Sequence, residues 1–70
     1  MYVSEQARTE VLRRRMRGER QYQIAKLARL HPTVLSAMLN RMWSVDRDDE
    51  RVIRLAGVLG LKPEDCVAAD

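Results

Sequence analysis

The chain has no phenylalanine, a single cysteine and no long apolar run. Its three aromatic side chains are Tyr2, Tyr22 and Trp43, so a folded core must be built from Leu, Val, Ile, Met and Ala, which suit helices. Cys66 alone cannot form an internal disulfide, which fits a reducing compartment such as the cytoplasm. The lack of a long apolar run and of a signal-peptide pattern at the N-terminus predicts a protein with no membrane segment.

Residues that carry out catalysis or bind cofactors are also scarce. The chain has one histidine, His31, and it has no glycine-rich phosphate loop. A nucleophile paired with a base, or a set of metal ligands, cannot be drawn from these residues. We therefore expect no enzyme: no catalytic residues, no metal site and no cofactor.

The distribution of charge is uneven along the chain. Residues 1–41 carry nine Lys/Arg against three Glu, whereas residues 42–70 carry four Lys/Arg against seven Asp/Glu. A basic half joined to an acidic half predicts a molecule that offers one face to a polyanion. Solvation of a single helix explains the arginine run of residues 13–15 equally well.

Apolar residues recur at helical spacing, and no strand pattern is found. The sequence therefore predicts an all-α fold, a compact bundle of about five short helices in one domain spanning residues 1–70. Ser4 and Gly18 are expected to begin and end the first helix, whose buried residues would include Leu12 and Met16. The helices are expected at about 4–17, 21–28, 32–40, 47–59 and 63–68.

The second and third helices meet the demands of a helix-turn-helix over about 21–40. Two helices joined by a turn of three or four residues cross steeply, and a small residue is needed at the crossing, here Ala25. The outer face of the third helix then carries Pro32, Thr33, Ala37 and Asn40. A face of this kind lies in the major groove of DNA in such motifs.

Two stretches of the chain follow a known pattern. They are Gln21-x-x-Ile24-Ala25-x-x-Ala28-x-Leu30-His31-Pro32-x-Val34-Leu35-Ser36-x-x-Leu39-Asn40 and Val52-Ile53-Arg54-Leu55-Ala56-x-x-Leu59-Gly60-Leu61-x-Pro63-Glu64-Asp65. In order and spacing they resemble the phage-repressor and Cro-like (XRE-type) helix-turn-helix family, over about residues 12–65. The resemblance implies a lambda-repressor-like fold and a transcriptional regulator, a repressor, that binds double-stranded DNA. It also implies a cytoplasmic protein of bacterial, phage or plasmid origin.

The resemblance further implies roles for single residues, since phosphate contacts position such a protein and base contacts give it specificity. The base-facing residues would be Pro32, Thr33, Ser36 and Ala37. The phosphate-contacting residues would be Arg20, Gln21, His31, Asn40 and Arg41. Two of the single residues have a structural alternative: His31 as a helix cap, and Trp43, a candidate wedge against DNA, as a side chain packed beneath the fourth helix.

Three arginines depart from the family pattern. Arg29 occupies a turn position that usually holds glycine because its φ is positive, and Arg41 occupies the usual glycine position after Asn40. Arg20 stands where a Ser or Thr cap is usual. Since Arg20 and Arg41 flank the expected phosphate contacts, we hypothesise that local stability is exchanged for electrostatic attraction to DNA.

A second class of function stays open at this point. The same fold serves protein-interaction modules such as antitoxins, anti-repressors and factors that bind the transcription machinery. A protein partner would dock on the acidic C-terminal half through a late apolar set, Leu59, Leu61, Cys66 and Val67. A second copy of the chain is a further candidate partner, because family members commonly pair to read DNA half-sites; sedimentation as a monomer at high micromolar concentration would exclude this homodimer.

Overall fold

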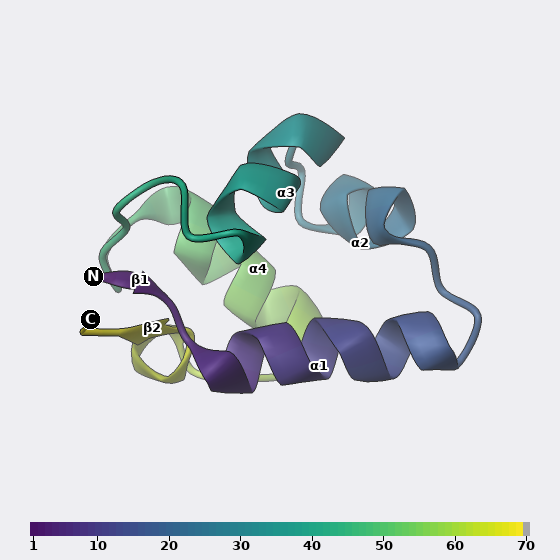
Figure 1. Cartoon of the computed structure of the whole chain (residues 1–70), viewed down its shortest axis with the longest axis horizontal. Helices are drawn as coiled ribbons and strands as arrows, with labels where there is room; N and C mark the ends of the chain where they lie inside the picture. Colours follow the sequence, from purple (N-terminus) through teal and green to yellow (C-terminus); the bar gives the residue numbers. More distant parts are fainter. Residues whose placement is uncertain (70) are drawn as a thin grey trace.

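The computed structural model describes residues 1–69, most of which are helical (Figure 1). Four α-helices are α1 (Glu5–Met16), α2 (Gln21–Leu27), α3 (Pro32–Leu39) and α4 (Glu50–Leu59). A 3-10 turn (Pro63–Asp65) and two short strands, β1 (Tyr2–Val3) and β2 (Val67–Ala68), complete the described chain. In Figure 1, α1 lies along one side of the molecule, α2 and α3 lie on the other, and α4 passes behind and between them.

The two ends of the described chain correct the all-α prediction. β1 and β2 pair antiparallel, with Tyr2 opposite Ala68 and Val3 opposite Val67. The Ser4 N–H extends this pairing by donating to the Cys66 carbonyl at 2.9 Å. The fifth helix predicted over 63–68 is therefore wrong: only the 3-10 turn forms, because the chain then extends to pair with β1.

The boundaries of α1 and α4 follow their capping residues. The Ser4 Oγ accepts from the Ala7 N–H at 3.2 Å, and Gly18 follows α1 with φ of +97°, as predicted. Asp49 caps α4, which starts at Glu50 instead of the predicted position near 47. Gly60 ends α4 with φ of +70°.

The core is aliphatic, but α1 contributes less to it than its periodicity predicts. Ala7 and Val11 are buried, whereas Leu12 is 54% and Met16 81% exposed. α1 packs mainly against α2 and α4, which cover the side of the helix that carries Ala7 and Val11. Of the late apolar set, Leu59, Cys66 and Val67 are core residues and Leu61 packs against the core.

Arg29 and Arg41 end α2 and α3 in the same unusual way. Their φ values are +57° and +58°, so the positive φ that the family pattern requires at Arg29 is present on an arginine. After Arg29, the Leu30 N–H donates to the Ala25 carbonyl at 2.8 Å, and after Arg41 the Met42 N–H donates to the Ala37 carbonyl at 3.0 Å. Both helices thus end in a Schellman motif whose left-handed residue is normally glycine.

Replacing Arg29 by glycine is expected to stabilise the fold. The left-handed conformation costs a non-glycine residue about 1–2 kcal/mol, and the greater backbone freedom of glycine in the unfolded chain cancels about 0.5–1 kcal/mol of that gain. Thermal unfolding of Arg29→Gly should show a midpoint a few degrees above that of the native chain. Arg29→Val should lower it, because a β-branched side chain is strained further at positive φ; a midpoint unchanged in both variants would contradict the strain.

Candidate nucleic-acid interface

α2 and α3 pack against each other as a pair joined by the four residues 28–31. Ala25, in the middle of α2, is completely buried, and so are Leu35 and Met38 of α3. The end of α2 is fastened to α4, where the Arg54 Nε donates to the Ala28 carbonyl at 3.0 Å. The pair therefore has a fixed orientation on the rest of the molecule.

The exposed face of α3 is narrower than the sequence predicts. Pro32, Thr33 and Asn40 are exposed and Ser36 is half-buried, and the Asn40 Nδ2 donates to the Ser36 Oγ at 3.4 Å. Ala37 is only 7% exposed, so its expected place on the outer face is wrong. After α3 the chain turns back, and the Met42 N–H donates to the Ala37 carbonyl. α3 also packs against β1.

His31 is the N-cap of α3. Its Nδ1 accepts from the Thr33 N–H at 3.1 Å, which confirms the capping alternative. A ring nitrogen that accepts this bond carries no proton, so only Nε2 is left to donate to a phosphate. His31 and Asn40 lie at opposite ends of α3, roughly 13–14 Å apart along its axis.

Gln21 and Asn40 are brought together at the other end of this surface. They line one depression of about 340 Å³ between α1 and the α2–α3 pair. A second depression continues from Gln21 past Arg20 and Tyr22. The Arg20 side chain is exposed, and the Gln23 Oε1 accepts from the Arg20 N–H at 2.8 Å, so Gln23 supplies a cap that Arg20 cannot.

Arg41 lies beyond the C-terminal end of α3, where its guanidinium is 5.4 Å from the centroid of the Tyr2 ring. It does not line either depression. Of the five expected phosphate-contacting residues, Gln21 and Asn40 therefore share one depression and Arg20 is next to it, whereas Arg41 and His31 lie apart.

Comparisons of the chain with models of known protein families, with curated proteins and with solved structures found no match.

The arginines of α1 fall into two groups. Arg13 pairs with Glu10 of the same helix at 3.2 Å, and the Arg14 Nη2 donates to the Val58 carbonyl at 2.7 Å, so both arginines have partners and Arg14 joins α1 to α4. Arg8 and Arg15 are exposed and line the depression that holds Gln21 and Asn40. Sequence reasoning missed both, although their spacing of seven residues, two helical turns, places them on one face of α1.

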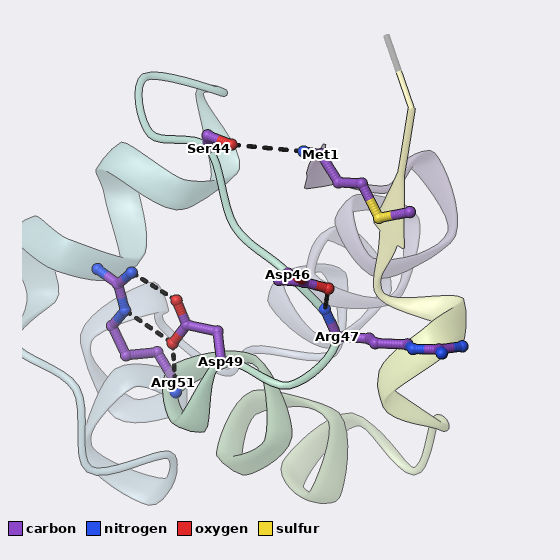
Figure 2. A network of polar contacts seen from close by, with 6 residues as sticks. All are labelled: Met1, Ser44, Asp46, Arg47, Asp49 and Arg51. Atoms are coloured by element: carbon purple, nitrogen blue, oxygen red, sulfur yellow. Dashed lines mark hydrogen bonds and ion pairs between the residues drawn. The ribbon is translucent and has the colours of Figure 1, made fainter.

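The segment between α3 and α4 is held by polar contacts (Figure 2). The Met1 amine donates to the Ser44 Oγ at 3.4 Å, and the Arg51 guanidinium binds the Asp49 carboxylate through bonds of 2.6 and 3.0 Å. These bonds from Arg51 hold the pKa of Asp49 below its usual value. Arg51 also lies 5.5 Å from the centre of the Trp43 ring, so Trp43 packs beside the first turn of α4 and remains 40% exposed.

A metal site or a membrane-spanning helix would indicate another class of function. Within residues 1–69, no three His, Cys, Asp or Glu side chains are grouped so as to hold a metal ion. None of the helices in this range has the length and apolar character needed to cross a membrane.

Proposed function

We propose that this chain is a DNA-binding transcriptional regulator of lambda-repressor-like fold, in which α2 and α3 act as a helix-turn-helix. The observation that carries the proposal is the position of Asn40. It belongs to the polar stripe of Thr33, Ser36 and Asn40 on α3, and it also lines the depression that contains Gln21. Groups suited to base edges and groups suited to phosphates are thus adjacent, as a reader of duplex DNA requires.

The charge on this side of the molecule supports the proposal. Two of the three acidic side chains in residues 1–41, Glu10 and Glu19, lie within 3.2 and 3.6 Å of Arg13 and Arg14. The remaining exposed cations, such as Arg20, have little negative charge nearby to offset their own. Lys and Arg side chains of this kind supply the sequence-independent part of DNA affinity by releasing counterions from phosphates.

Contacts to the phosphates should dominate over contacts to the bases. Pro32 has no donor, Thr33 and Ser36 offer one hydroxyl each, and the burial of Ala37 removes a methyl group from the reading face. Asn40 carries the one amide of this stripe, and the resemblance assigns that amide to a phosphate. The proposed regulator therefore has a modest sequence preference on top of a strong electrostatic term.

Titration of duplex DNA at 50 and 200 mM salt tests the proposal, followed by the half-exposed Trp43 and by the anisotropy of a labelled duplex. The expected result is binding at low salt that weakens steeply with salt, by about 0.9 decades in affinity per decade of salt for each phosphate neutralised. Absence of binding at low salt would contradict the proposal and favour the alternative, a protein-interaction module such as an antitoxin or anti-repressor.

Arg20→Ala and Arg41→Ala are each expected to weaken binding on every sequence tested and to flatten the salt dependence by roughly one unit of log–log slope. Arg47→Ala is the matched control, because it removes an exposed arginine from the acidic half. Circular dichroism should confirm that each variant folds, since Arg41 also contacts the Tyr2 ring. A slope that is unchanged in the first two variants, or lowered as much by Arg47→Ala, would refute the assignment.

A further inference from the structure

We propose that α1 makes a second, independent contact with the DNA backbone, in which Arg8 and Arg15 bind two phosphates of one strand. The inference rests on the proposed function and extends the DNA-binding surface from the α2–α3 pair across the depression onto α1. It assigns a role to a helix whose arginines the sequence alone does not separate from solvated residues.

The spacing of the two arginines selects an extended polyanion over a small one. They lie seven residues apart on one face of α1, so their Cα atoms are separated by roughly 10 Å along the helix axis. A single phosphate ion accepts from both guanidinium groups only when the two side chains bend toward each other, whereas a strand requires no such convergence. Phosphates recur along a nucleic-acid strand, so a strand lying along α1 provides one phosphate for each arginine.

Arg8 and Arg15 are also free to bind. Both side chains are exposed, and neither forms a hydrogen bond or ion pair with another side chain within residues 1–69. Arg13 and Arg14, by contrast, are engaged with Glu10 and with the Val58 carbonyl. The chain thus leaves unpaired those two arginines of α1 that line the depression.

The other residues of the depression are suited to the rest of a DNA strand. Gln21 and Asn40 supply amide donors on the wall opposite α1, and Thr9 adds a hydroxyl between the two arginines. Leu12, 54% exposed, also lies between them and offers an apolar surface to the sugars. Glu5 lines the end near Arg8, and its carboxylate repels phosphate there, which limits how far the strand can follow α1.

The test compares two double variants that each remove two positive charges from the α1 segment. Arg8→Ala/Arg15→Ala should lower the log–log salt slope by about 1.8 and weaken duplex binding roughly sixtyfold at 0.1 M salt, since each lost contact accounts for about 0.9 decades per decade of salt. Arg13→Ala/Arg17→Ala, on other faces of the segment, should leave the slope near that of the native chain. Circular dichroism controls for folding of both.

Two further arms address the ligand. Glu5→Gln should tighten duplex binding severalfold, because it removes the one negative charge of the depression. Inorganic phosphate is titrated into the complex at constant ionic strength. It should not displace the duplex below roughly 10 mM, because a single weak ion pair is not occupied at that concentration. Displacement at lower concentrations would show that the depression binds a small anion instead of a strand.

The outcomes separate this inference from the proposed function. Salt-dependent binding by the native chain, with equal slopes in the two double variants, overturns the role of α1 and leaves the function standing. A native chain that does not bind duplex at low salt overturns both. A selective loss in Arg8→Ala/Arg15→Ala supports the contact by α1.

Discussion

Replacing Leu35 by alanine is expected to lower the free energy of unfolding by about 2–5 kcal/mol, through lost burial and the cavity left behind. Leu35 is completely buried in the core, where α3 meets the rest of the molecule. A 70-residue domain has a total stability of roughly 4–10 kcal/mol. The variant should therefore be partly or largely unfolded at 37 °C and lose duplex binding with its fold.

Leu12→Ala is the matched control for this substitution. The chemical change is the same, but Leu12 is 54% exposed, so its removal should alter the free energy of unfolding by no more than about 0.5 kcal/mol. Urea unfolding followed by far-UV circular dichroism measures both. Equal losses in the two variants would show that Leu12 is a core residue, as its helical spacing predicts. They would contradict the exposure of Leu12 on α1.

The second large effect is a loss of stability in alkali that depends on Cys66. Burial raises the pKa of the Cys66 thiol to about 11, with a smaller contribution from the negative charge of Asp65. The unfolded thiol ionises near its usual pKa of 9.0. Between these two values the unfolded chain has released a proton that the folded chain retains, so rising pH favours unfolding.

The contribution of the thiol to stability is therefore complete below pH 9 and is lost between pH 9 and about 11. The difference between the two pKa values corresponds to a loss of about 2–3 kcal/mol. Urea midpoints at pH 8 and pH 11 measure this loss in the native chain and in Cys66→Ala, which share every other ionisable group. The native chain should lose more stability than the variant over this range, and an equal loss would show that the thiol is not desolvated.

The features that the sequence predicts best are those encoded in one or two adjacent residues. Ser4 and Gly18 mark the ends of α1 because a cap or a left-handed residue acts on the nearest turn. Both signals are local, and the structure confirms both. At Arg29 the sequence leaves either strain or an altered turn, and the observed φ of +57° is the strained form.

The sequence does not predict features that depend on residues far apart along the chain. Periodicity shows that Leu12 and Met16 share a side of α1 with apolar residues, but not how wide a stripe the rest of the molecule covers. Ala37 is buried, although its position on α3 predicts an exposed side chain. The pairing of β1 with β2 joins residues from opposite ends of the chain, and two-residue strands are too short to show alternation.

The same distinction applies to the residues of the candidate site. The resemblance implies a phosphate contact for Gln21 and another for Asn40, but their meeting in one depression follows only from the packing of the helices. The inclusion of Arg8 and Arg15 is not anticipated either, because the sequence does not show which arginines of α1 are occupied by partners. Arg14 belongs to the fold because it binds the carbonyl of Val58, far along the chain, and pairs with Glu19, whereas Arg15 stays on the surface.

The most direct test of the account maps the duplex onto the chain residue by residue. Amide nitrogen–proton spectra are recorded while a short duplex is added at low salt. We expect the amide signals of Gln21, Thr33, Ser36 and Asn40 to shift as the duplex is added. The signals of Gly57 and Leu59 in α4 should not shift. Shifts confined to the acidic segment 46–50, or no shifts at all, would contradict a DNA-binding surface built from α2 and α3.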